Sequence, residues 1–150
     1  MILWRISNYA DLSGLGGLRA AARWHSAGAP IVYTASSPAS ALLEVLVHLE
    51  LHDPLDMPSH YQLLKLDVPD SVSISAIDER SLDANWRTNV FATRAMGDKW
   101  LRAQSSALLA VPSAIVPDTN NTLLNPQHRD TKKIKIVGHG SFPFDFRLFK

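Results

Sequence analysis

The sequence contains no cysteine among its 150 residues. That absence excludes a disulfide framework, a thiolate nucleophile and any metal site with cysteine ligands. An excess of one charge is also missing, because 15 Lys and Arg residues against 14 Asp and Glu residues give a formal net charge of +1. Nucleic-acid-binding domains usually carry a marked basic excess, and many disordered chains carry a strong net charge. Neither class fits this composition.

Long hydrophobic runs are absent as well. The longest nearly apolar stretch, 41–51, is interrupted by Glu44, His48 and Glu50, whereas a membrane-spanning helix needs about 20 apolar residues. The apolar start of the chain, 1–6, contains a charge and follows no basic leader, which argues against a secretory signal. We therefore expect a soluble, cytoplasmic protein with no membrane contact.

The length and the apolar fraction predict a single domain over residues 1–150. Apolar residues make up 46% of the chain, and a chain of this length buries roughly 68–70% of the surface that its unfolded form exposes. Such a core is large enough to fold without a metal ion or a disulfide.

Alternating or β-branched segments predict several strands. They lie at 1–6, 31–34, 61–68, 72–75, 133–137 and 144–148. Two further apolar runs, 107–111 and 114–116, are hinged at Pro112 and Ser113, and 120–130 is loop-like around a short apolar piece. Two main helices interrupt the strands without a regular strand–helix–strand rhythm. This order predicts an α+β fold with a mixed or mostly antiparallel sheet.

The first helix has the clearest signals. Ser37 is a suitable N-cap and Pro38 suits the first helical position. Apolar residues then recur at intervals of three and four, and we expect the helix to end near His52, before Pro54. The second helix is expected at 91–104, although Gly97 costs about 1 kcal/mol relative to alanine.

The glycine-rich segment 14–17 does not form a known nucleotide-binding motif. Arg19 stands where a dinucleotide-binding fingerprint needs its third glycine, and no Gly-Lys-Ser/Thr follows. The segment indicates a flexible turn, or alternatively a loop that frames a ligand with Arg19 or Arg23 nearby. His48 and His52 have a spacing that can chelate zinc on a helix, but a solvated helix end fits them better.

Three polar residues leave functional and structural interpretations open. Glu44 lies within an apolar helical segment, where it is either held for a function or forms an exposed i,i+4 pair with His48. Arg23, beside Trp24, either contacts a phosphate or packs its stem over the indole. Ser113 has no nucleophile-elbow context and fits a turn.

A series of short blocks runs through the chain in a fixed order. The blocks are Trp4-Arg5, Arg23-Trp24, Tyr33-Thr34-Ala35, Ala41-Leu42-Leu43-Glu44, Gly97-Asp98-x-Trp100-Leu101, Val111-Pro112-Ser113-Ala114-Ile115, Asn121-x-x-x-Asn125-Pro126-x-His128 and Phe144-Asp145-x-Arg147-Leu148. This series resembles the RES domain, the toxin half of the bacterial Xre–RES toxin–antitoxin systems.

The resemblance implies a core similar to that of ADP-ribosyltransferases, with NAD as substrate and no metal. The Arg, Glu and Ser that name the family match Arg23, Glu44 and Ser113, which the resemblance makes catalytic. Arg5 and Tyr33 match two further pocket positions, and Asn125 matches a late asparagine, so that the expected NAD-binding set is Arg5, Arg23, Tyr33, Ser113 and Asn125. His25 departs from the pattern, because relatives usually have an asparagine after the Arg-Trp pair.

The chemistry of NAD cleavage suggests a role for each of these residues. As nicotinamide leaves, positive charge builds on the ribose, and the Glu44 carboxylate would stabilise it. Arg5 and Arg23 would neutralise the pyrophosphate, and Tyr33 would stack on the nicotinamide ring. Ser113 would orient nicotinamide or Glu44. The acceptor is left open between water, phosphate and a protein side chain.

Three functions remain in competition. The first is a toxin that depletes NAD as a glycohydrolase or phosphorylase, and the second is an ADP-ribosyltransferase that modifies a host protein. The third is a non-catalytic interaction module, in which the polar residues need not converge. The resemblance also implies a partner, a helix-turn-helix antitoxin of the Xre type that covers the active site in a toxin–antitoxin complex, and it leaves DNA contact to that partner.

Overall fold

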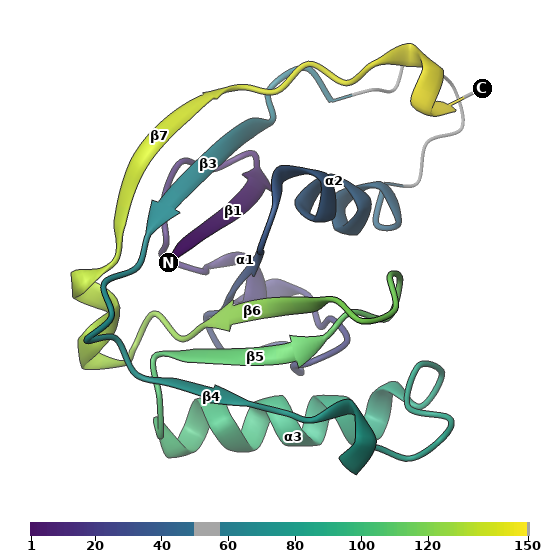
Figure 1. The fold of residues 1–150 in the computed structure, drawn as a ribbon, viewed down its shortest axis with the longest axis vertical. Coiled ribbons are helices and arrows are strands. Elements are labelled where there is room, and N and C mark those ends of the chain that lie inside the picture. Colours follow the sequence, from purple (N-terminus) through teal and green to yellow (C-terminus); the bar gives the residue numbers. More distant parts are fainter. Residues whose placement is uncertain (50–57, 150) are drawn as a thin grey trace.

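The computed structural model describes residues 1–49 and 58–149. Its centre is a seven-stranded sheet in the order β4-β5-β6-β2-β1-β3-β7 (Figure 1). The strands are β1 (Ile2–Ser7), β2 (Val32–Ala35), β3 (Gln62–Asp67), β4 (Ile74–Ala76), β5 (Leu108–Pro112), β6 (Asn120–Leu124) and β7 (Lys135–Ser141). The α-helices are α1 (Gly16–Arg19), α2 (Pro38–Leu46) and α3 (Val90–Ala103), and the short 3-10 helices are η2 (Glu79–Ser81), η3 (Arg129–Lys133) and η4 (Phe146–Phe149).

The sheet is mixed, as the sequence predicted. Within the described residues β4 and β5 form the one parallel pair, and the other neighbouring strands are antiparallel. The parallel pair is joined through α3, because a parallel connection needs a crossover long enough to hold a helix. None of the helices in 1–49 and 58–149 has the length and apolar character that crossing a bilayer requires.

The helix that carries Glu44 begins as predicted. The Ser37 Oγ accepts a hydrogen bond from the backbone N–H of Ser40 at 3.1 Å, and Pro38 occupies the first turn. The helix ends at Leu46 rather than near His52, which itself lies outside the described residues. Beyond Leu46 the hydrogen bonds change to the 3-10 pattern, because the N–H groups of His48 and Leu49 donate to carbonyls three residues back.

Two strand predictions need correction. The alternation at 144–148 is wrong as a strand: Asp145 Oδ1 accepts from the backbone N–H of Arg147 at 2.8 Å, and this Asx turn starts η4. Conversely, the loop-like 120–130 contains β6, a central strand between β5 and β2. Pairing on both sides overrides the low strand propensity of its asparagines.

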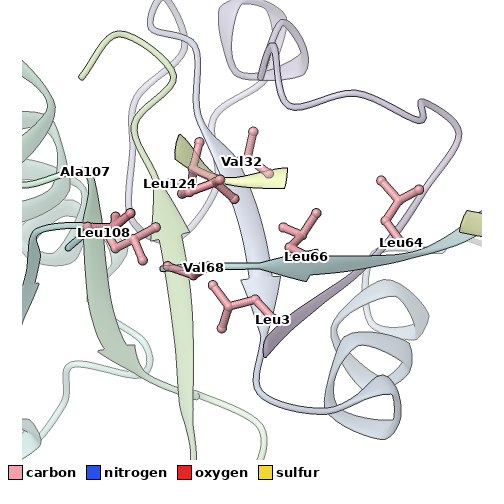
Figure 2. Close-up of a cluster of buried hydrophobic side chains, with 10 residues drawn as sticks. Leu3, Val32, Leu64, Leu66, Val68, Ala107, Leu108 and Leu124 are labelled. Atoms are coloured by element: carbon pink, nitrogen blue, oxygen red, sulfur yellow. The ribbon is translucent and has the colours of Figure 1, made fainter. Parts of the chain in front are cut away.

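The core consists of three clusters of buried side chains. One lies around the centre of the sheet and joins Leu3, Val32, Leu66 and Leu108 (Figure 2). A second joins Trp24, Trp86, Trp100, Leu109 and Leu123, and it packs α3 against β5 and β6 (Figure 1). The third joins Ile6, Ala35, Ala41 and Phe144. This last cluster fastens α2 to β1 and β2, and it thereby fixes the position of Glu44 relative to the sheet.

Candidate active site

A cleft of about 610 Å³ opens beside β1, β2 and α2, and the 8–20 segment forms much of its rim. This volume is typical of a site for a small organic ligand. Its wall includes Arg5, Tyr33, Glu44 and Asn121, which come from four different elements of the chain. In the glycine-rich 14–17 segment, residues 14–15 form a turn and residues 16–17 begin α1, and the segment lines the cleft together with Arg19.

Glu44 is held by two hydrogen-bond donors. Ser113 Oγ donates to Glu44 Oε1 at 3.1 Å, and Asn121 Nδ2 donates to the same oxygen at 2.6 Å. The carboxylate is half-buried, and in the described residues its bonds go to these two side chains rather than to His48. The second turn of α2 thus presents a fixed carboxylate to the cleft, and Ser113 acts on Glu44 directly.

Asn121 is the site residue that sequence reasoning missed. It lies at the start of β6, opposite Ala35 of β2, and α2 follows closely after Ala35. Because an ionised carboxylate only accepts hydrogen bonds, the Asn121 amide must turn its nitrogen toward Glu44. The buried Oδ1 is then left without a hydrogen-bond partner in the described part of the chain. Recognising 120–124 as a strand would have been only a first step, because the contact with Glu44 also depends on the pairing of β6 with β2.

Asn125 lies elsewhere. It is fully buried, its Nδ2 donates to the Leu101 carbonyl at 3.3 Å, and its Oδ1 accepts from the backbone N–H of Gln127 at 3.0 Å. Its carbonyl accepts from Thr131 Oγ1 at 2.6 Å. These bonds hold the turn after β6, so the structure does not bring Asn125 together with Glu44.

The two arginines occupy different positions. Arg5 lines the cleft, where its Nη1 donates to the Asp11 carbonyl at 3.2 Å. Burial lowers the pKa of Arg5, and the nearby Asp11 carboxylate opposes that shift. A guanidinium nonetheless stays charged at neutral pH.

The guanidinium of Arg23 is turned toward the 83–89 connection. Its Nη1 donates to the Arg87 carbonyl at 2.6 Å and to the Trp86 carbonyl at 3.4 Å. Burial lowers the pKa of Arg23, while the Glu44 charge, which is close enough to act on it, raises the pKa. Among the described residues the cleft wall does not include Arg23, so the side chain must rotate to reach a ligand there.

Tyr33 and His25 form a pair in the cleft wall. His25 Nδ1 lies 2.9 Å from the Tyr33 hydroxyl, which also accepts from the backbone N–H of Trp24 at 3.3 Å. Burial raises the pKa of Tyr33 and lowers that of His25. The phenol and the imidazole are therefore both neutral at pH 7.

Helix α3 fixes the loop that carries Arg23 and His25. Thr93 Oγ1 donates to the Arg23 carbonyl, and Arg94 Nε donates to the Ala22 carbonyl, each at 2.7 Å. Asp98 Oδ1 accepts from the backbone N–H of Ser26 at 2.8 Å. Gly97 packs directly on the same loop, which explains why a glycine stands in the middle of a helix.

The described residues contain no group of three or more His, Asp or Glu side chains that is arranged to hold a metal ion. Of the possible zinc pair, His52 lies outside those residues. The cleft brings together the fixed carboxylate of Glu44, the cationic side chains of Arg5 and Arg19 and the ring of Tyr33, with the cationic Arg23 nearby. Such a set suits an anionic ligand that contains a planar ring and develops positive charge during its reaction.

Comparison with known proteins identifies relatives of the chain along its whole length. The RES domain matches residues 2–145. A protein named Toxin Res from Pseudomonas putida is 50% identical over 149 residues, covering 99% of this chain and 100% of the relative. A protein named Prs ADP-ribosylating toxin from Sphingobium is 37% identical over 157 residues, covering 98% and 96% of the two chains.

A solved structure supports the fold. The MbcT–MbcA toxin–antitoxin complex of M. tuberculosis contains a chain that matches with a TM-score of 0.75 at 16% identity, over 94% of this chain and 83% of that one. This likeness confirms the expected α+β fold. With a family match over nearly all of its residues and a relative of the same length at half identity, the chain belongs to the RES domain family.

Proposed function

We propose that this chain is the toxin of a toxin–antitoxin system and that it breaks the nicotinamide–ribose bond of NAD in the cleft. The observation that carries the proposal is the Glu44 carboxylate, which Ser113 and Asn121 hold in a cleft also lined by Arg5 and Tyr33. The relatives named as toxins, one of them an ADP-ribosylating toxin, support the same conclusion.

The reaction needs stabilisation of positive charge. The bond from the ribose carbon to the nicotinamide nitrogen breaks with its electron pair going to nicotinamide, which departs neutral, so the ribose becomes oxocarbenium-like. A preorganised carboxylate stabilises that charge without having to reorganise. Glu44 supplies it, and Ser113 and Asn121 keep the carboxylate from turning away. Of the two roles that the sequence left open for Ser113, orienting Glu44 is the one that its hydrogen bond supports.

The remaining side chains bind and orient NAD. Arg5 neutralises the pyrophosphate from within the cleft, and Arg23 joins it after leaving the carbonyls of Trp86 and Arg87. Tyr33 offers a ring face for the nicotinamide, which fixes the direction of the breaking bond. Asn125 takes no part in this scheme, because its polar groups already hold the turn after β6.

The acceptor of the ADP-ribosyl group separates two variants of this function. Water or phosphate would make the chain a glycohydrolase or phosphorylase that depletes NAD. A protein side chain would make it an ADP-ribosyltransferase, which the Sphingobium relative's name favours. Incubating cell extract with NAD labelled in its adenylate moiety distinguishes them, since transfer gives a labelled protein band and depletion gives small labelled products.

Convergence of the site residues argues against a non-catalytic interaction module. Glu44 is bonded to Ser113, it shares a cleft wall with Tyr33, and its charge acts on Arg23. A module that uses these side chains for surface ion pairs would not need to place Glu44 and Tyr33 in one cleft, with Ser113 bonded to Glu44 and Arg23 within reach of its charge.

An antitoxin partner follows from the toxin role. The structural relative was solved as a toxin–antitoxin complex. In this chain Tyr9 and Leu15 line the cleft while remaining 61% and 59% exposed. Large exposed apolar side chains beside a functional cleft suit a protein that covers it. We assign that role to an Xre-type antitoxin in the cytoplasm.

Induced expression tests the proposed function in cells. The wild-type chain should lower the cellular NAD pool and arrest growth, and co-expression of the cognate antitoxin should prevent both effects. At an equal protein level, Glu44→Ala should neither lower the cellular NAD pool nor arrest growth. Growth arrest by Glu44→Ala equal to that of the wild type would reject the enzymatic toxin.

A further inference from the structure

The Tyr33 hydroxyl makes two contacts inside the protein. A tyrosine hydroxyl donates one hydrogen bond and accepts others. The backbone N–H of Trp24 donates to it at 3.3 Å, and His25 Nδ1 lies 2.9 Å away. His25 is 2% exposed, so this second contact is shielded from water. The direction of the His25–Tyr33 bond decides whether the hydroxyl proton is available to a ligand.

The surroundings of the imidazole favour a proton on Nε2. This atom is buried and has no hydrogen-bond partner in the described residues. The backbone carbonyls of Gly17 and Ala20 lie close enough to raise the pKa of the ring, although burial has the larger effect and lowers it. If Nδ1 carried the proton instead, the Tyr33 hydroxyl would accept from both Trp24 and His25, and its own proton would have no acceptor among the described residues. With the proton on Nε2, Nδ1 carries the lone pair and accepts the Tyr33 proton.

We propose that His25 is a positioning residue for the reaction at the cleft: it accepts the hydrogen bond of the Tyr33 hydroxyl and holds the phenol ring in the cleft wall. This inference rests on the proposed function, because it concerns the same site. With its hydroxyl engaged by His25 and Trp24, Tyr33 offers a ligand its ring face rather than a hydrogen bond. The pair therefore selects a planar aromatic group.

The two charges that act on His25 come from α3 and have opposite signs. Asp98 raises the pKa of His25 and Arg94 lowers it. The same loop is fastened to α3 through Asp98 and Arg94, which hold the backbone on both sides of His25 in place beside Tyr33. The contact is thus part of a fixed framework rather than a chance approach of two side chains.

Two conservative variants separate the positioning role from simple space filling. His25→Asn places a polar atom near the position of Nδ1 and can keep the Tyr33 bond, while His25→Gln places one near Nε2 and loses it. One hydrogen bond is worth about 0.5–1.5 kcal/mol, which corresponds to roughly a two- to thirteenfold effect. We expect His25→Gln to lower kcat/KM for NAD by that factor, mainly through KM, and His25→Asn to restore most of it.

The double variant with Tyr33→Phe tests the coupling. In the Tyr33→Phe background the bond is already gone, so His25→Gln and His25→Asn should have equal kcat/KM. If His25→Gln and His25→Asn still differ in kcat/KM when Tyr33 is phenylalanine, the proposal is overturned, because His25 would then act without the Tyr33 hydroxyl. Melting temperatures of the variants show whether each has folded.

Nitrogen-15 NMR of the imidazole supplies a readout that is independent of activity. The proposal predicts an unprotonated Nδ1 and a protonated Nε2 for His25 at pH 7.5, and the reverse would overturn it. If the wild type fails to cleave NAD, the proposed function fails whatever the NMR result. If the wild type cleaves NAD and His25→Gln matches it, only the positioning role fails.

Discussion

Replacing Gly97 with alanine tests whether α3 positions the Arg23 loop. A Cβ atom at residue 97 would lie 1.6 Å from the Trp24 carbonyl oxygen and 2.8 Å from the carbonyl carbon. Both atoms belong to the backbone, so no side-chain rotation relieves the clash. Because Cβ contacts shorter than 3.0 Å are essentially never observed, the helix and the loop must separate by more than 1 Å.

The magnitude follows from the bonds that such a separation breaks. Three hydrogen bonds join α3 to the loop, from Thr93, Arg94 and Asp98. At about 1 kcal/mol each their loss costs about 3 kcal/mol, and the better helix propensity of alanine returns about 1 kcal/mol. The net loss of about 2 kcal/mol corresponds to a melting temperature roughly 4–8 °C lower in a chain of this size.

Thermal unfolding followed by circular dichroism measures this effect, with Gly140→Ala as the matched control. Gly140 lies in β7, where an added Cβ meets nothing within 4 Å. We expect Gly140→Ala to melt within about 1 °C of the wild type. A Gly97→Ala variant that is as stable as the wild type, or more stable, would refute the close packing of α3 on the loop.

Further predictions concern the site and its pH response. Arg23→Ala should weaken NAD binding, and it should also lower the melting temperature by a few degrees because Arg23 donates hydrogen bonds to the carbonyls of Trp86 and Arg87. Calorimetric titration measures the first effect and a thermal melt measures the second. An unchanged affinity for NAD would remove Arg23 from the site. Asn121→Ala should lower kcat for NAD about tenfold, since Glu44 Oε1 loses its shorter hydrogen bond, and a wild-type kcat would contradict the role of Asn121. Burial lowers the pKa of His25 below 6.5, so the unfolded state takes up a proton first and stability falls as the pH drops below about 6.5. His25→Asn should show a smaller fall in denaturant titrations between pH 7.5 and 5.5, and an equal fall would assign the pH response to other groups.

Local signals in the sequence predicted much of the fold. The N-cap of α2 formed as expected, because Ser37 and Pro38 act through their immediate neighbours. Most strands also formed near their predicted positions, since alternation reflects a sheet with one buried face. The segment 144–148 shows the limit of that pattern, because a side-chain bond from Asp145 turned an alternating sequence into a 3-10 helix.

The candidate site could be predicted only in part. The resemblance named Arg5, Tyr33, Glu44 and Ser113, and the fold gathers these residues around Glu44 and its cleft. Asn121 was missed because its contact with Glu44 depends on β6 pairing beside β2, a long-range event that no local pattern encodes. Gly97 counted against a helix in the sequence, yet the packing of that helix requires it.

Nicotinamide release from NAD tests the central claim most directly. The purified chain is incubated with NAD, with and without phosphate, beside a Glu44→Gln variant that keeps the size of the side chain and removes its charge. We predict release by the wild type and loss of release in Glu44→Gln at an unchanged melting temperature, with any dependence on phosphate identifying the acceptor. Release by Glu44→Gln at the wild-type rate would contradict the account, because the carboxylate held by Ser113 and Asn121 would then have no part in breaking the bond.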